Sequence, residues 1–285
     1  MVTVYAGGMI LRPVTEADKP ALLVVESKST PNLSYLPAVY GMFLADAPRG
    51  EFMLVEEDGA VLGCAKYTLL PDGSAWLETL RVVPEAQGRG LGKRIYERFF
   101  ELARELGVPT MRMYTGVDNV VSKGLAGHFG FTLEETFHGF SRPVGPVRKA
   151  PAFQAVSDPV QATDLLMPLR PAWGDFLVMN RTFYPFMPDV CAHLARRGMV
   201  YSDGHNVLVA GARFSPEEAL HLALFAGDAA ACLSFAERVA QQRSSRRLLC
   251  LFPTSRAETE TALEHAGFVP DRGEYIVMKV DVQQA

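Results

Sequence analysis

The sequence predicts a mixed α/β protein built from two domains. Short apolar segments with strand character alternate with amphipathic helical segments along the chain. A proline-rich segment at 142–151 interrupts this pattern, as an extended linker does. A similar order of elements then returns, and 285 residues are enough for two domains. We therefore expect one domain over residues 1–145 and a second over 146–285.

The first domain is predicted to begin with a strand and a helix whose N-cap is Thr15, with Asp18 three residues later. A long helix with an apolar stripe follows a glycine-rich turn, and Gly107 ends it. A short helix precedes Gly130 and Phe131. Strands are expected at 9–13, 51–56, 61–69, 75–83 and 110–115.

The glycine-rich turn at 87–92 lies between a strand and the long helix. The first amides of a helix point outward without partners, and the helix dipole favours negative charge there. Glycines let a phosphate approach the backbone, because a side chain would keep it away. The turn therefore predicts a site for a pyrophosphate.

Two common phosphate loops do not fit this turn. A Walker A loop would need Gly at Gln87 and Ser or Thr at Arg94. A dinucleotide fingerprint has two residues between its second and third glycines, whereas this chain has only one between Gly90 and Gly92. The spacing of Gln87, Gly90 and Gly92 instead resembles the acetyl-CoA signature of the GNAT superfamily of N-acetyltransferases.

Two further segments resemble the same family, and the resemblance covers roughly residues 8–140. Leu80, Val82 and Pro84 resemble its central strand and the exit from it, and 119–131 resembles its short helix ending in Gly-Phe. The resemblance implies two tandem GNAT-like domains, each with a mixed, mostly antiparallel central sheet flanked by helices. It also implies an N-acetyltransferase that moves an acetyl group from acetyl-CoA to a primary amine by direct attack in a ternary complex.

The second domain is predicted to be a degenerate copy. The separation of Gly227 and Gly267 equals that of Gly90 and Gly130, and a similar order of strands and helices accompanies it. The second copy lacks the glycine-rich loop, and Asp228 would place a carboxylate where phosphate must lie. We expect this domain not to bind coenzyme A but to shape the acceptor site or to form a homodimer contact.

The resemblance also implies which residues hold the cofactor. The strand backbone would pair with the pantetheine arm, and the loop amides would bind the pyrophosphate with charge added by Arg89 and Lys93. Asn119 matches an asparagine that touches the cofactor in the family, although an N-cap role is an equal alternative. The expected acetyl-CoA-binding residues are Leu80, Val82, Gln87, Gly88, Arg89, Gly90, Leu91, Gly92, Lys93 and Asn119.

Glu78 is the expected general base. Simple alternation places it on the face of Trp76, Leu80 and Val82, where apolar surroundings would raise the pKa of its carboxyl group. A cross-strand partner role, an exposed edge position or a strand bulge that turns Glu78 the other way are the alternatives.

The general acid is less clear from the sequence. The family often has a tyrosine where this chain has Ala126, so Ser122, Tyr114 or water would protonate the leaving thiolate. The thiol's low pKa makes it a fair leaving group even without an acid.

Composition excludes several other classes. The net charge of −4 gives no electrostatic reason to expect nucleic acid or a membrane as partner. The four cysteines and six histidines lack the spacings of a disulfide framework or a metal site. Without a signal peptide or an apolar span, we expect a cytoplasmic protein.

The acceptor is expected to be a small-molecule or peptide amine, with its identity open. One alternative is a non-catalytic acyl-CoA sensor or scaffold, which Ala126 favours. Another is an acyltransferase that uses a different acyl-CoA or acceptor. A tandem member of the superfamily with its activity in the C-terminal half is a further alternative, which the N-terminal position of the intact loop disfavours.

Overall fold

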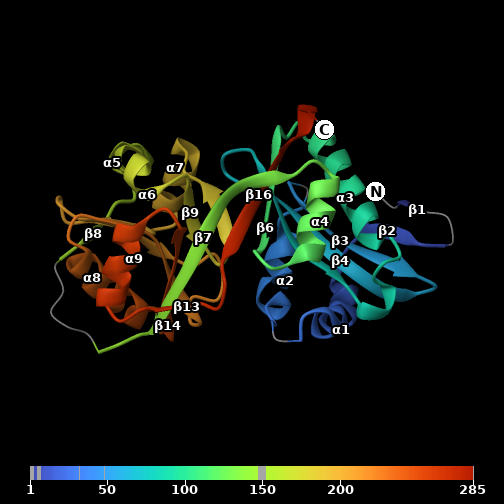
Figure 1. The fold of residues 1–285 in the computed structure, drawn as a ribbon, viewed down its shortest axis with the longest axis horizontal. Coiled ribbons are helices and arrows are strands. Elements are labelled where there is room, and N and C mark those ends of the chain that lie inside the picture. Colours follow the sequence, from blue (N-terminus) through green and yellow to red (C-terminus); the bar gives the residue numbers. More distant parts are fainter. Residues whose placement is uncertain (1–2, 5–7, 32, 48, 147–151, 285) are drawn as a thin grey trace. The chain divides into compact units, whose positions relative to one another are not determined.

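The computed structural model describes residues 3–4, 8–31, 33–47, 49–146 and 152–284. The chain forms two compact units, and Figure 1 labels most of their elements. The first unit contains Met1–Tyr114, Val120–Thr132 and Met278–Ala285, and the second contains Thr115–Asn119 and Leu133–Val277. Among the described helices, none is long and apolar enough to cross a membrane.

The first unit contains most of the elements predicted for it. Two elements were not predicted, β1 and α2; the α2 segment is apolar almost throughout, so its sequence shows no amphipathic helical period. The elements are β1 (Thr3–Val4), β2 (Ile10–Pro13), α1 (Lys19–Ser29), α2 (Leu36–Ala45), β3 (Glu51–Glu57), β4 (Ala60–Leu69), β5 (Ala75–Val82), α3 (Leu91–Glu105), β6 (Thr110–Gly116) and α4 (Val120–His128).

The strands of the first unit pair in the order β1-β2-β3-β4-β5-β6, with only β5 and β6 parallel. Neighbouring residues of β4 point to opposite faces of this sheet. The Lys66 ammonium binds Asp46 at the end of α2 at 2.6 Å, whereas the Tyr67 ring lies 6.1 Å from that of Phe99 in α3. The C-terminal end of α2 therefore lies on one face of this sheet, and α3 lies on the other. The helix α4 lies beside α3 (Figure 1).

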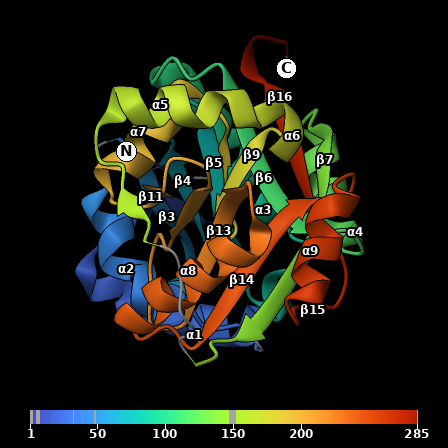
Figure 2. The same cartoon turned by 90° about the vertical axis from the view of Figure 1, so that its left-hand side faces the viewer.

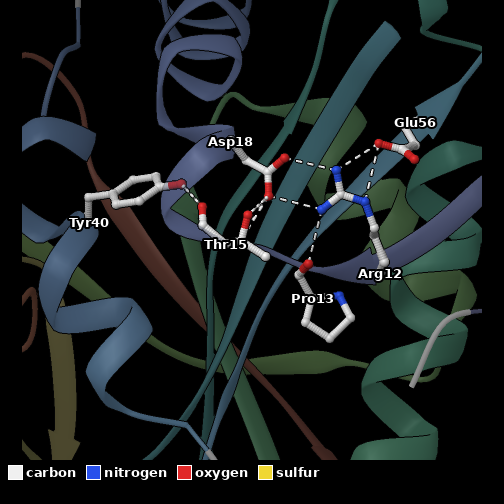
Figure 3. A network of polar contacts seen from close by, with 6 residues as sticks. All are labelled: Arg12, Pro13, Thr15, Asp18, Tyr40 and Glu56. Carbon is white, nitrogen blue, oxygen red and sulfur yellow. Dashed lines mark hydrogen bonds and ion pairs between the residues drawn. The ribbon is translucent and has the colours of Figure 1, made fainter. Parts of the chain in front are cut away.

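A polar network joins β2, β3 and the start of α1 (Figure 3). The Arg12 guanidinium donates to Asp18 at 2.8 and 2.9 Å and to Glu56 at 2.8 and 3.2 Å. Thr15 completes the predicted capping box with Asp18, and the Tyr40 hydroxyl of α2 donates to the Thr15 carbonyl at 2.6 Å. The hydrogen bonds from Arg12 hold the pKa of Asp18 well below its usual range.

In the second unit the strands pair in the order β7-β14-β13-β12-β11-β8, with β15 also beside β7, and β9 and β10 form a separate hairpin. Figure 2 shows α8 in front of β13 and β14. The elements are β7 (Thr132–Pro143), β8 (Gln154–Ala155), α5 (Pro159–Leu166), α6 (Arg170–Trp173), β9 (Phe176–Met179), β10 (Thr182–Pro185), α7 (Pro188–Arg196), β11 (Val200–Ser202), β12 (Val207–Gly211), β13 (Ala219–Ala226), α8 (Ala229–Gln242), β14 (Arg247–Pro253), α9 (Ala257–His265), β15 (Val269–Pro270) and β16 (Tyr275–Asp281).

The two units repeat one arrangement. In the second unit, an antiparallel β11-β12 hairpin is followed by β13, α8, a strand β14 parallel to β13, and α9. In the first unit, the β3-β4 hairpin is followed by β5, α3, the parallel strand β6, and α4. The predicted repetition of the fold is therefore confirmed.

The units are not the two contiguous parts expected from the sequence. Most of β7 belongs to the second unit, and residues 278–285 at the end of β16 and beyond belong to the first. The start of the predicted linker is also held in place: the Val144 amide donates to the Arg246 carbonyl at 3.0 Å, and the Gly145 amide donates to Glu237 at 2.9 Å. Residues 147–151 of that linker lie outside the described residues.

His221 is a buried titratable residue in the core of the second unit. It lies on β13 between Gly211 of β12 and Leu249 of β14, and its side chain is 4% exposed. Burial, followed by the nearby charges of Arg247 and Arg181, lowers the pKa of His221 to about 3. The folded protein therefore holds this imidazole neutral at pH values where the unfolded chain would protonate it.

We expect the free energy of unfolding to fall as pH decreases from about 6.5 towards 3, by up to about 1.4 kcal/mol per pH unit from this group. A histidine whose pKa is lowered by folding binds its proton at a higher pH in the unfolded chain than in the folded protein. Its contribution to stability is therefore fully present above the unfolded pKa and is lost as the pH falls towards the folded pKa. The His221→Gln variant should therefore gain stability relative to wild type as pH falls from 7 to 4 in guanidinium unfolding. His265→Gln, on the exposed surface of α9, should follow wild type. Parallel curves for wild type and His221→Gln would contradict this assignment.

Candidate functional site

A bulge interrupts β5 at the centre of the first unit. Cys64 of β4 faces Arg81 and Lys66 faces Glu78, so Ala65 alone lies opposite the two residues Thr79 and Leu80. Thr79 has φ +62°, a left-handed conformation that β-branched residues rarely adopt. The bulge therefore shifts the side-chain alternation by one residue within the strand.

The expectation that Glu78 shares a face with Leu80 and Val82 was wrong, because the bulge reverses the alternation after Glu78. Glu78 lies on the face of Trp76 and Arg81, whereas Leu80 and Val82 point to the opposite face. The structure thus has the alternative arrangement, in which a strand bulge turns Glu78 to the face opposite Leu80 and Val82.

Beyond the bulge, β5 and β6 no longer pair. Their parallel register runs from Ala75 and Met111 to Leu77 and Met113. Within the described chain, residues 79–82 have no register partner on β6. This leaves an edge of β5 with the geometry to receive an extended ligand as if it were another strand.

Glu78 and Tyr114 lie on one face of the sheet. Glu78 accepts a hydrogen bond from Thr68 at 2.5 Å, which orients its carboxylate. Tyr114 stacks on Trp76 with ring centroids 6.0 Å apart and an interplanar angle of 1°. The structure therefore brings two of the predicted catalytic residues to the same side of β5.

Ser122, the other predicted acid, lies on a different side. Ser122 lies on α4, which packs against α3. At this contact the ring of Phe129, just after α4, stacks on the ring of Tyr96 in α3 with centroids 5.0 Å apart. Because α3 covers the face of β5 opposite Glu78, Ser122 does not share the face of the predicted base. Ala126, at the position where the family often has tyrosine, is fully buried.

The loop at 87–92 gives α3 an open N-terminus. Gly88 and Gly90 have φ values of +75° and +83°, and a Cβ at either would meet nothing within 4 Å. Gly90 is the N-cap of α3 and has no side chain to accept hydrogen bonds from its first amides. The Gln87 side chain donates to the Val82 carbonyl at 3.2 Å and so closes the loop onto β5. An anion could bind these amides.

The remaining predicted cofactor residues have varied surroundings. Arg89 is ion-paired with Glu57 at 2.6 Å, and Lys93 is exposed. Leu91 is in the core, 1% exposed. Asn119 is exposed and directly precedes α4, and its own amide donates to the Gly116 carbonyl at 3.0 Å.

Gly92 has a packing role. A Cβ at this position would lie 2.9 Å from Cδ2 of Leu125 in α4. The glycine therefore allows α4 to approach α3 closely, which is a different requirement from the positive φ of Gly88 and Gly90.

The corresponding helix of the second unit is closed by its own side chain. The Asp228 carboxylate accepts from the Ala230 and Ala231 amides at 2.9 and 3.2 Å. Asn206 in turn accepts from the Asp228 amide at 2.7 Å. The first amides, which have no side-chain acceptor at the N-cap of α3, are thus occupied at α8.

Comparisons with known proteins agree with this geometry. Residues 18–131 match the model of the Acetyltransferase (GNAT) family. A putative acetyltransferase from Pyrococcus horikoshii shares the fold over 98% of this chain and 91% of its own, with a TM-score of 0.68 and 16% identity. A tandem GNAT protein from the clavulanic acid biosynthesis pathway does so over 96% and 98%, with a TM-score of 0.60 and 13% identity. The fold is therefore that of tandem GNAT domains, and the match to the GNAT acetyltransferase family covers residues 18–131, less than half of the chain.

Two curated relatives carry the name mycothiol acetyltransferase. The protein from Beutenbergia cavernae is 30% identical over 145 residues, which are 46% of this chain and 48% of the relative. The protein from Pseudarthrobacter chlorophenolicus is 29% identical over 141 residues, which are 44% and 43%. The chain spans about half the length of the curated relatives that it matches.

Substituting Gly92 by alanine should lower the free energy of unfolding by about 1 kcal/mol, because the new methyl group forces Leu125 to move. Gly127→Ala in α4 is the matched control, since its Cβ would meet nothing within 4 Å. That change should stabilise the protein by about 0.5–1 kcal/mol through helix propensity. Equal stabilisation by both substitutions in urea unfolding would show that Gly92 is not a packing contact.

Proposed function

We propose that the first unit binds acetyl-CoA and transfers its acetyl group to an amine. The observation that carries the proposal is that the unpaired edge of β5 leads directly into the uncapped N-terminus of α3. An acyl-CoA has an extended, amide-bearing arm that ends in a pyrophosphate. The edge at 79–82 suits the arm, and the amides after Gly90 suit the pyrophosphate.

In this proposal the thioester supplies an activated acyl carbon. The residues of β5 bind the cofactor beside this carbon and remove the proton from the attacking amine. The edge amides bind the arm and polarise the carbonyl oxygen as charge develops on it. Glu78, oriented by Thr68, removes the proton from the attacking ammonium group. The new C–N bond forms as the C–S bond breaks, and the nitrogen loses two protons in all: the first goes to the base before attack, and the second leaves as the amide forms. The departing thiolate takes up one proton from a donor, so one proton is released to solvent.

We favour Tyr114 over Ser122 as that donor. Tyr114 shares the face of Glu78, and its stacking on Trp76 fixes the ring. Ser122 belongs to the helix layer on the other face of β5. Tyr114 therefore lies on the side from which the acceptor amine and its base act.

The acceptor is a small-molecule or peptide amine in this proposal. A thiol-release assay over a panel of polyamines, aminoglycosides, amino acids and peptide N-termini identifies the class. The acceptor of the mycothiol acetyltransferases belongs in the panel because of the curated relatives. Saturable thiol release with one class supports the proposal.

Replacing Gly90 by aspartate should weaken acetyl-CoA binding at least about tenfold, because a carboxylate would stand beside the amides that receive the pyrophosphate. Gly107→Asp is the matched control: Gly107 follows the other end of α3, has φ +65° and also borders open space. Isothermal titration calorimetry measures both. Unchanged affinity in Gly90→Asp would remove the loop from the cofactor site.

The Glu78→Gln variant should lower kcat by about 100-fold or more while leaving the dissociation constant for acetyl-CoA unchanged, as expected for the loss of a general base. Glutamine keeps the shape and can still pair with Thr68. Full activity of this variant would contradict the role of Glu78.

The alternative of a non-catalytic acyl-CoA sensor draws on Ala126, a buried alanine that supplies no hydroxyl where the family often has tyrosine. It predicts acetyl-CoA binding without thiol release for any acceptor in the panel, and no effect of Glu78→Gln on binding. Turnover with any amine excludes it.

A further inference from the structure

Tyr35 lies against the bulge of β5, and it belongs to none of the motifs recognised in the sequence. It is the N-cap residue of α2, and its hydroxyl is hydrogen-bonded to the Thr79 side chain. Thr79 is 7% exposed and is the bulge residue with positive φ. A β-branched residue in this conformation is strained, so contacts around it must hold it there.

Other contacts hold Tyr35 in place. Glu26 of α1, 2% exposed, accepts hydrogen bonds from the Tyr35 amide at 3.2 Å and the Leu36 amide at 3.1 Å. The Arg81 guanidinium lies 5.5 Å from the centre of the Tyr35 ring and 3.9 Å from the Glu26 carboxylate. The tyrosine is thus fixed through its backbone and across its ring.

The bulge is also held through its backbone. The Thr79 carbonyl accepts a weak hydrogen bond from the Cys64 thiol at 3.8 Å. Burial, with the charge of Glu78 second, raises the pKa of Tyr35, so its hydroxyl keeps its proton at neutral pH. The hydroxyl therefore serves as a lasting hydrogen-bond partner for Thr79.

We propose that Tyr35 is a positioning residue for the transfer reaction, acting through Thr79 to hold the bulge. The bulge separates Glu78 from the amides at Leu80 and Val82, so a strand that lost it would shift every later residue to the other face. Through this contact α2 sets the geometry of both the base and the cofactor edge. The inference rests on the proposed function of the same site.

The test is a double-mutant cycle of Tyr35→Phe and Thr79→Val, each of which removes one hydroxyl and keeps the shape. We expect each single variant to lower kcat/KM and the affinity for acetyl-CoA about tenfold, the equivalent of one hydrogen bond. The double variant should be no worse than either single variant, because the two groups act as one contact. Thr79→Ser, which keeps the hydroxyl, should retain near wild-type values.

Tyr40→Phe is the matched control. It also removes a buried tyrosine hydroxyl of α2, the one that donates to the Thr15 carbonyl at 2.6 Å away from the bulge (Figure 3). It should lower the melting temperature as Tyr35→Phe does, while leaving kcat/KM and acetyl-CoA affinity unchanged. A purely structural role for Tyr35 would make the two variants alike.

The outcomes separate the two proposals. Failure of the wild-type protein to bind acetyl-CoA would overturn the proposed function and this inference with it. Binding and turnover by wild type, with unchanged values for Tyr35→Phe or multiplicative losses in the double variant, would overturn the positioning role alone.

Discussion

The bulge at Thr79 is the constraint on which the candidate site depends. It places two residues of β5 opposite one of β4, and so sends Glu78 and the pair Leu80 and Val82 to different faces. It also lies where β5 loses its register with β6, so the backbone beyond it has a free edge. The position of the proposed base on one face and a row of strand amides at the edge both follow from this one irregularity. The geometry of the candidate site therefore depends on the bulge in β5 as well as on the side chains that β5 carries.

The two units show how little separates an open anion site from a closed one. Both have a strand, a turn and a helix in the same order, and both place a parallel strand after the helix. At α3 the N-cap is Gly90, which leaves the first amides without a side-chain acceptor. At α8 the N-cap is Asp228, whose carboxylate already occupies two of them. The N-cap residue, together with the glycine-rich loop that the second unit lacks, accounts for the different chemistry expected of the two units.

Most of the fold could be predicted from local signals, because turn residues, helix caps and apolar periodicity act over short stretches of the chain. Thr15, Gly90 and Gly107 were located correctly by such signals. The face of Glu78 was predicted incorrectly because the bulge residue is Thr79, and threonine is not a residue type that indicates a positive φ or a bulge. Tyr35 was missed because it reaches Thr79 from a helix far away in the sequence, and α2 itself lacks a polar face. The exchange of end segments between the units likewise has no local signature.

We propose one coenzyme A site in this chain, at α3 of the first unit, because the first amides of α3 have no side-chain acceptor whereas Asp228 already occupies those of its counterpart α8. The stoichiometry of acetyl-CoA binding to the full chain, measured by isothermal titration calorimetry, tests it most directly. The account predicts one molecule bound per chain. A stoichiometry of two, or no saturable binding, would contradict it.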